Sequence, residues 1–136
     1  MNVSSIKGSW VMAIHVVWDD ADKSIIRWDF EPEWDWNDFW EAFAESIRMG
    51  EGYTRRVDVI PDVTHTKRLP IGALGAFKSV DAKLPDFTKL VVVAGSDSMT
   101  RTMIRTFAQI NRIDSWRTAT TVDEARSIIM SDRKTS

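Results

Sequence analysis

The segment Lys89-Leu90-Val91-Val92-Val93-Ala94-Gly95 contains the longest aliphatic run of the chain. A short, mostly β-branched run that ends in a glycine turn is typical of a strand buried on both faces of a parallel sheet. We therefore expect a central strand over residues 89–94. The polar turn Gly95-Ser96-Asp97-Ser98 then leads into a helix.

The chain on both sides of this strand alternates between strand and helix patterns. Toward the C-terminus we expect a strand over residues 116–121 and a last helix directly after it. Toward the N-terminus, Pro70 suits the first position of a helix, and a strand over residues 56–60 is closed by Pro61. The apolar stripes of the three helices are Ile71, Leu74, Phe77 and Val80; Met99, Met103, Ile104, Phe107 and Ile110; and Ala125, Ile128 and Ile129.

The first third of the chain predicts a hairpin and a helix. Residues 10–18 and 25–30 alternate between inward and outward positions, and the polar stretch 19–24 joins them, which indicates two antiparallel strands. Asp35 suits the N-cap of the following helix, and Gly50 suits its end.

Strict alternation of strands and helices after a hairpin favours a mainly parallel sheet with right-handed crossovers. The predicted fold class is therefore α/β: a mixed, mainly parallel five-stranded sheet with an N-terminal antiparallel hairpin and four helices, in the order ββαβαβαβα. We expect one domain over residues 10–130, with a flexible N-terminus over residues 1–9 and a flexible tail over residues 131–136.

The composition excludes several kinds of site. The 136 residues include no cysteine and only two histidines, His15 and His65, which excludes thiol nucleophiles and cysteine zinc sites and argues against a multi-histidine metal site. No dinucleotide-binding or P-loop motif follows a strand. The net charge of −2 does not suggest a nucleic-acid binder. No signal peptide or membrane span is predicted, so we expect a cytoplasmic protein without a cofactor.

Two predicted strand-end loops offer candidate binding residues. In parallel α/β sheets, ligands bind outside the carboxyl ends of the strands. Hydroxyls, a histidine and two cations near helix N-termini could contact an anion, although the same residues could equally be helix caps and a solvated pair of cations. The candidates are Thr64, His65, Thr66, Lys67, Arg68, Ser96, Asp97 and Ser98. A second candidate is an aromatic ligand surface at Trp34 and Trp36, which flank the turn after the second strand.

Over about residues 10–130 the chain resembles the STAS superfamily, and within it the small stand-alone bacterial STAS-like (anti-sigma-factor-antagonist-like) proteins. The resemblance depends on the element order, on Val57–Thr64 leading into Leu69–Leu74, on Lys89–Gly95, and on the tryptophan-rich tract Ile26–Phe39. It implies a non-catalytic module that binds a protein partner or a small ligand.

One part of the chain departs from the STAS pattern. The Asp-Ser-Ser-Gly motif of phosphorylated members corresponds to Lys67-Arg68-Leu69-Pro70 here, which carries no hydroxyl. We therefore expect no phosphoserine switch, with Thr64 and Thr66 the nearest hydroxyls.

Three functional hypotheses follow. The first is a regulatory or scaffolding protein–protein interaction domain with an unidentified partner. The alternative is a carrier or sensor of a small apolar or lipid-like ligand, which the surplus of tryptophan in the first third supports. An enzyme comes third, because the sequence offers no recognisable catalytic set. A homodimer is left open.

Overall fold

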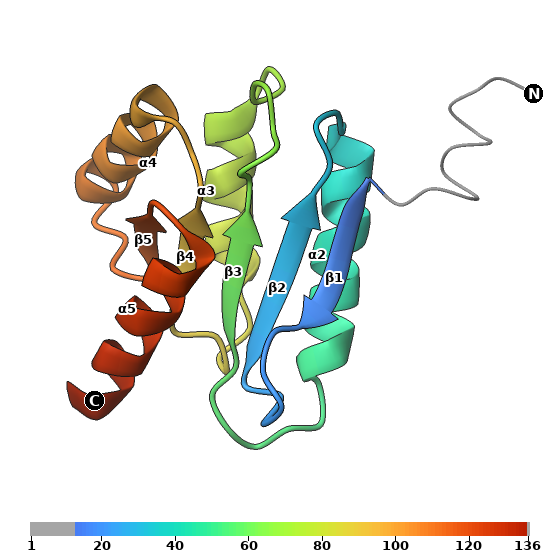
Figure 1. Cartoon of the computed structure of the whole chain (residues 1–136), viewed down its shortest axis with the longest axis vertical. Helices are drawn as coiled ribbons and strands as arrows, with labels where there is room; N and C mark the ends of the chain where they lie inside the picture. Colours follow the sequence, from blue (N-terminus) through green and yellow to red (C-terminus); the bar gives the residue numbers. More distant parts are fainter. Residues whose placement is uncertain (1–12, 136) are drawn as a thin grey trace, which may run out of the picture.

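The computed structural model describes residues 13–135. The N-terminal stretch expected to be flexible, residues 1–9, lies outside the described residues, and so does the start of the first expected strand. The elements are β1 (Ile14–Trp18), β2 (Ile25–Phe30), α2 (Trp36–Gly50), β3 (Asp58–Asp62), α3 (Ala73–Lys83), β4 (Val91–Ala94), α4 (Ser98–Ile110), β5 (Trp116–Ala119) and α5 (Val122–Thr135). The predicted order ββαβαβαβα is confirmed (Figure 1).

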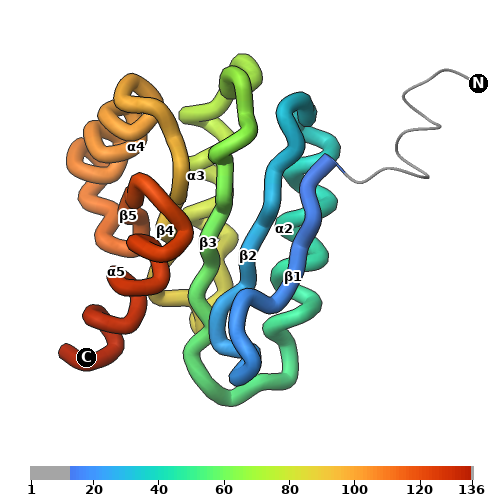
Figure 2. Tube along the Cα trace, in the orientation of Figure 1, coloured from blue at the N-terminus to red at the C-terminus, as the bar shows by residue number. Residues whose placement is uncertain are grey.

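The five strands lie side by side in the order in which the chain makes them, β1-β2-β3-β4-β5 (Figure 2). β1 is antiparallel to β2, and the remaining neighbours are parallel. Each right-handed crossover adds the next strand on the same side of the strand before it. The connecting helices α2, α3 and α4 therefore all cover one face of the sheet. α5 packs on the opposite face, against β3, β4 and β5. The mixed five-stranded α/β fold predicted from the sequence is thus confirmed.

Each face of the sheet has its own apolar core. Beneath α2, α3 and α4 the core is largely aromatic, and its rings are Trp28, Phe30, Phe39, Phe43, Phe77, Phe107 and Trp116. Beneath α5 it is smaller and aliphatic, with Ile25, Ile60, Leu90, Val92, Ala94, Ala119, Ala125 and Ile129. Along β4 the side chains alternate between the two cores, so β4 is buried on both faces, as its sequence predicts. The middle strand of the sheet is β3, however, and β4 lies between it and the edge strand β5.

Pro61 does not close β3, as expected, but lies inside it. In the ladder to β4, the backbone N–H of Val59 donates to Leu90 (3.1 Å), and that of Val63 donates to Ala94 (2.9 Å). Pro61 stands midway between these two donors and has no N–H, so the ladder loses one bond. The bonds on either side hold the strand together, which is why a proline is tolerated here.

Two of the expected helical stripes are partly wrong. α3 begins after Gly72, whose φ of +95° breaks the helix before it, so Pro70 is not a helical residue. As a result Ile71 is 99% exposed and Leu74 is 47% exposed, although Phe77 and Val80 are buried as expected.

On α4, Met99 and Ile110 are also exposed, at 83% and 74%. The 13 residues of α4 span about 20 Å, whereas the four-residue strands beneath it span about 13 Å. Both ends of the helix therefore extend beyond the sheet, while Ile104 and Phe107 in its middle are buried.

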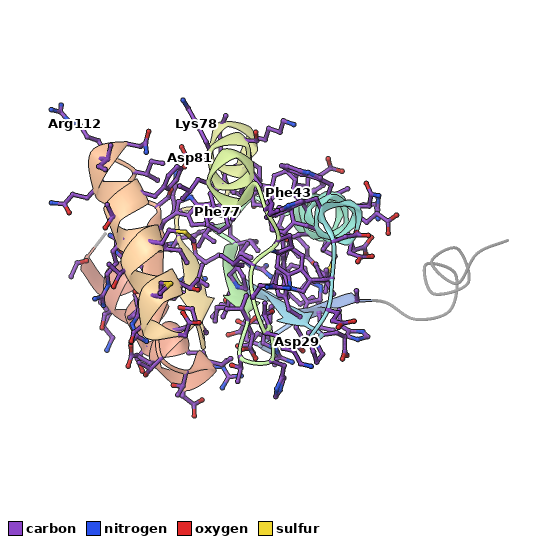
Figure 3. All side chains as sticks on the ribbon, turned by 90° about the horizontal axis from the view of Figure 1, so that it is seen from above. Asp29, Phe43, Phe77, Lys78, Asp81 and Arg112 are labelled. Carbon is purple, nitrogen blue, oxygen red and sulfur yellow. The ribbon has the colours of Figure 1, made fainter. Side chains whose placement is uncertain are left out.

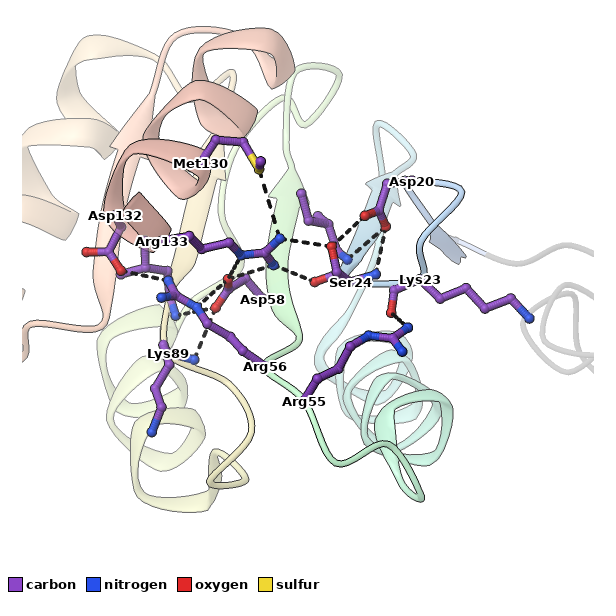
Figure 4. Close-up of polar contacts among 12 residues, drawn as sticks. Asp20, Lys23, Ser24, Arg55, Arg56, Asp58, Lys89, Met130, Asp132 and Arg133 are labelled. Carbon is purple, nitrogen blue, oxygen red and sulfur yellow. Dashed lines mark hydrogen bonds and ion pairs between the residues drawn. The ribbon is translucent and has the colours of Figure 1, made fainter. Parts of the chain in front are cut away.

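The segment expected to be a flexible tail, residues 131–136, lies largely in a helix: α5 continues to Thr135, and Ser136 lies outside the described residues. Polar contacts join this last turn to the rest of the domain. Arg133 donates to the backbone carbonyl of Ser24 (2.8 Å), and Asp132 pairs with Arg56 (2.7 Å) (Figure 4). The polar sequence therefore makes ion pairs with the body of the domain.

A buried carboxylate lies at the centre of these contacts. Asp58, at the start of β3, is fully buried and pairs with Arg56 (2.7 Å) and Arg133 (3.0 Å). It also accepts the backbone N–H groups of Lys89 (3.1 Å) and Leu90 (2.9 Å). One side chain thus joins β3, the start of β4 and the end of α5 (Figure 4).

A second ion-pair cluster joins the other end of α5 to the hairpin. The side chain of Asp19 is only 2% exposed and pairs with Arg126 (2.7 Å) and Arg27 (2.6 Å). The hydrogen bond from Arg126 lowers the pKa of Asp19 below its ordinary value, against the opposing effect of burial, and Arg27 adds to the lowering. Folding therefore favours the ionised carboxylate.

This pKa difference predicts how Asp19→Asn changes the pH dependence of stability. Near neutral pH the variant should lose about 1–3 kcal/mol of unfolding free energy, since charged hydrogen bonds are lost. The contribution of Asp19 is present above its unfolded pKa and disappears as pH falls through its lower folded pKa. In urea titrations, the difference in unfolding free energy between variant and wild type should therefore narrow as the pH falls below the ordinary pKa of an aspartate, about 4.

A control for this prediction lies in the same turn. Asp22→Asn removes the same charge from an exposed position and should stay within about 0.5 kcal/mol of wild type. If the difference in unfolding free energy between Asp19→Asn and wild type does not change with pH, the prediction is wrong.

Candidate functional site

The loops that follow β3 and β4 lie against each other at the carboxyl edge of the sheet. They form a groove of about 150 Å³, on the same edge as the N-termini of α3 and α4. Among the candidate residues, the groove is lined by Thr64, Thr66, Lys67, Arg68, Ser96 and Asp97. The structure thus brings most of the two predicted loops into one place.

His65 and Ser98 are not part of this groove. His65 is exposed and lines a different hollow, beside α5, together with Asp29, Asp62 and Arg126. Figure 3 shows Asp29 pointing away from the face that α2 and α3 cover. Ser98 is the first residue of α4. The imidazole is therefore on the opposite side of the loop from Lys67 and Arg68.

Close backbone approach at Gly95 fixes the two loops relative to each other. Gly95 has φ +81°, and a Cβ at this position would overlap Oγ1 of Thr64 and lie 2.8 Å from its Cα. Only glycine fits both the backbone conformation and the space.

We expect Gly95→Ala to lower the unfolding free energy by about 1–3 kcal/mol, because the loops must separate and the backbone is strained. Chemical denaturation measures this directly. Gly75→Ala is the matched control. Gly75 lies inside α3, and an added Cβ would meet no neighbouring atom within 4 Å. This substitution should therefore raise the unfolding free energy by about 0.5–1 kcal/mol. Equal effects of the two substitutions would show that the loops are not in close contact.

The electrostatics of the groove do not favour a small anion. The N-terminus of α4 is already capped by Asp97, which accepts the backbone N–H of Thr100 (2.7 Å). This hydrogen bond lowers the pKa of Asp97, so a carboxylate occupies the position that an anion would take. Lys67 and Arg68 are exposed at the rim. The capping interpretation therefore describes Asp97 better than an anion contact.

Trp34 and Trp36 are half-buried, as expected, but they hold the loop before α3. Trp34 Nε1 donates to Thr66 Oγ1 (3.1 Å), and Trp36 Nε1 donates to the carbonyl of Ile71 (2.7 Å). Their rings meet edge to face, with centroids 5.2 Å apart. The two indoles thus brace one side of the groove.

An apolar cavity of about 60 Å³, which no sequence pattern indicates, lies between the sheet and helices α2 and α3. Phe43 of α2 and Phe77 of α3 line it, and Figure 3 shows both rings between their helices and the sheet. Val63, Leu69 and Thr100 line both the cavity and the groove, so the two share a wall.

Two further features bear on metal ions and membranes. Within residues 13–135 no group of three or more histidine and acidic side chains is placed to hold a metal ion. His15 pairs with Glu31 (3.0 Å) at an exposed position on β1. None of the described helices is long and apolar enough to cross a membrane.

Comparison with models of protein families, with curated proteins and with solved structures finds no match for this chain. The resemblance to STAS-like proteins therefore stays a prediction.

Proposed function

We propose that this protein is a non-enzymatic interaction module that docks a protein partner at the carboxyl edge of its sheet. The observation that carries the proposal is a set of exposed apolar side chains at the N-terminal ends of α3 and α4, on the same edge of the sheet as the groove. Ile71 is 99% exposed, Met99 83% and Leu74 47%. Large apolar side chains gathered at one edge are more typical of a docking site than of a solvated surface.

The charges at the same edge suggest the chemistry of the partner. Lys67 and Arg68 at the rim outnumber Asp97, the acidic residue that lines the groove. An acidic partner segment with apolar side chains would match both properties, and its binding would weaken as salt screens the charges.

The predicted resemblance points to the same edge. The element order and the loop before α3 support a STAS-like regulatory module of a bacterial cytoplasm. Because Lys67-Arg68-Leu69-Pro70 carries no hydroxyl, the proposed docking is constitutive and needs no phosphoserine.

The test compares two isoleucines on the same protein. Ile71→Glu places a charge at the centre of the proposed site, whereas Ile110→Glu makes the same change at the far end of α4, where Ile110 is 74% exposed. Proteins crosslinked in the native cell should be identified for wild type and both variants by quantitative mass spectrometry. We expect Ile71→Glu to reduce a specific partner at least about tenfold and Ile110→Glu to leave it unchanged.

Equal loss in both variants, or no loss in either, would contradict docking at this edge. Crosslinking of the chain to itself through position 71 would identify the partner as a second copy.

The cavity favours a second candidate function, a carrier or sensor of a small apolar ligand. A ligand there would contact Val63, Leu69 and Thr100, which also form a wall of the docking groove. Native mass spectrometry of protein purified from its own host tests this candidate, since a retained small molecule would support it.

A further inference from the structure

The cavity beneath α2 and α3 is narrow and extends along the whole helical layer. Its lining runs from Trp34 and Leu69 near the carboxyl edge to Leu84 and Phe87 at the opposite end. Its volume is about 60 Å³. One water needs about 10–15 Å³ in such a cavity, so the space suits a molecule of about four to six heavy atoms.

Two hydrogen-bond donors in the lining are unpaired. Trp28 and Trp116 line the cavity, and Nε1 of each is buried without an acceptor among the described residues. A buried indole N–H normally finds a partner, and leaving it unpaired costs free energy. By contrast, Nε1 of both Trp34 and Trp36 is paired. Trp34 also lines the cavity, but its N–H is already used, so the indole donors left for a ligand are those of Trp28 and Trp116.

The two donors are separate positions. Trp28 lies on β2 and Trp116 on β5, with two strands between them. At the usual strand spacing they are about 14 Å apart across the sheet. One small molecule can therefore pair with one of them at a time.

The lining also limits the charge of a ligand. The described residues around the cavity include no charged side chain. Apart from the indoles of Trp28, Trp34 and Trp116, its polar side chains are the hydroxyls of Ser46, Thr88 and Thr100. A carboxylate or ammonium group would be buried here without a counter-charge, at a prohibitive cost. A water molecule would need two to four polar partners, which a mostly apolar wall does not supply well.

We propose that this cavity binds a small uncharged molecule that has a hydrogen-bond acceptor, such as a short ketone, ester or ether. The acceptor pairs with Nε1 of Trp28 or Trp116, and the apolar remainder fills the space between Phe43 and Phe77. This inference deepens the second candidate function and rests on it, and it does not depend on protein docking.

The test is a titration of ¹⁵N-labelled protein with 2-pentanone, followed through the indole N–H signals in NMR spectra. We expect the signal of Trp28 or Trp116 to move downfield and saturate. The signal of Trp36 should stay in place, because its N–H already donates to Ile71 and it does not line the cavity. If the responding indole is Trp28, Trp28→Phe should weaken 2-pentanone binding about 3- to 10-fold while keeping an aromatic ring; Trp116→Phe is the corresponding test for Trp116.

A second ligand separates the acceptor from the apolar contact. 2-Methylpentane has the same number of heavy atoms and shape as 2-pentanone but no acceptor, so it should bind more weakly and should not be affected by the Trp→Phe substitution. Val80→Ile, which adds one methyl group to the wall, should weaken both ligands.

Three results would overturn the proposal. Both indole signals could remain unmoved up to the solubility limit of 2-pentanone, the two ligands could bind equally well, or the indole protons could exchange magnetisation with a bound water that 2-pentanone does not displace. A molecule retained in native mass spectrometry, with no response of either indole to 2-pentanone, would keep the carrier function and reject this site.

Discussion

Val92→Asp should leave the chain unfolded under conditions in which the wild type is folded. Val92 is fully buried in β4 and packs with Ile60 and Leu90 beneath α5. A carboxylate here would be buried without a partner, at an expected loss of more than about 4 kcal/mol. That loss is comparable with the whole stability of a typical domain, about 5–15 kcal/mol. Circular dichroism during heating should show no cooperative transition.

The control places the same residue on the same sheet. Val17 lies on the edge strand β1 and is 37% exposed. Val17→Asp should therefore lower the unfolding free energy by no more than about 1 kcal/mol. A Val92→Asp variant that melts near the wild-type temperature would show that β4 is not an interior strand.

Asp58→Ala should be the second most damaging substitution, with a loss of about 3–5 kcal/mol. It removes the acceptor for two arginines and for the backbone N–H groups of Lys89 and Leu90. Arg56 and Arg133 would remain close together without the buried negative charge between them. Urea unfolding followed by tryptophan fluorescence measures the loss.

Two comparisons isolate the reason for this loss. Asp123→Ala removes a carboxylate that is 89% exposed and pairs with Arg126 within α5, so it should cost less than about 1 kcal/mol. Asp58→Asn keeps an acceptor for the backbone N–H groups but removes the charge. Its loss of unfolding free energy should therefore lie between those of Asp58→Ala and Asp123→Ala. A loss below about 1 kcal/mol for Asp58→Ala would show that its ion pairs have no net effect on folding.

The strands and the order of elements along the chain could be predicted well because burial leaves a direct pattern. β4 is apolar at every position since it is covered on both faces, and the parallel crossovers follow from strict alternation. Element ends were less predictable. Pro61 costs β3 one ladder bond only, and Ile71 is apolar but lies before the first turn of α3.

The candidate site was predictable in part for a similar reason. Parallel strands end at a common edge, so the loops around Lys67 and Asp97 had to be neighbours. Which side of the loop His65 takes depends on backbone turns that no sequence pattern records. The cavity depends on how well rings from several elements fill space, and the pairing of Asp58 with Arg133 joins residues 75 positions apart.

The agreement between strand order and chain order has a kinetic consequence. Each parallel strand pairs with the one made before it, so every pairing closes only one crossover, which keeps the entropy of loop closure small. The sheet can therefore grow in one direction as the chain leaves the ribosome. The most distant contacts join Arg126 to Asp19 and Arg133 to Ser24, 107 and 109 positions apart. We therefore expect docking of α5 to be the last step of folding, since it joins the end of the chain to its first hairpin.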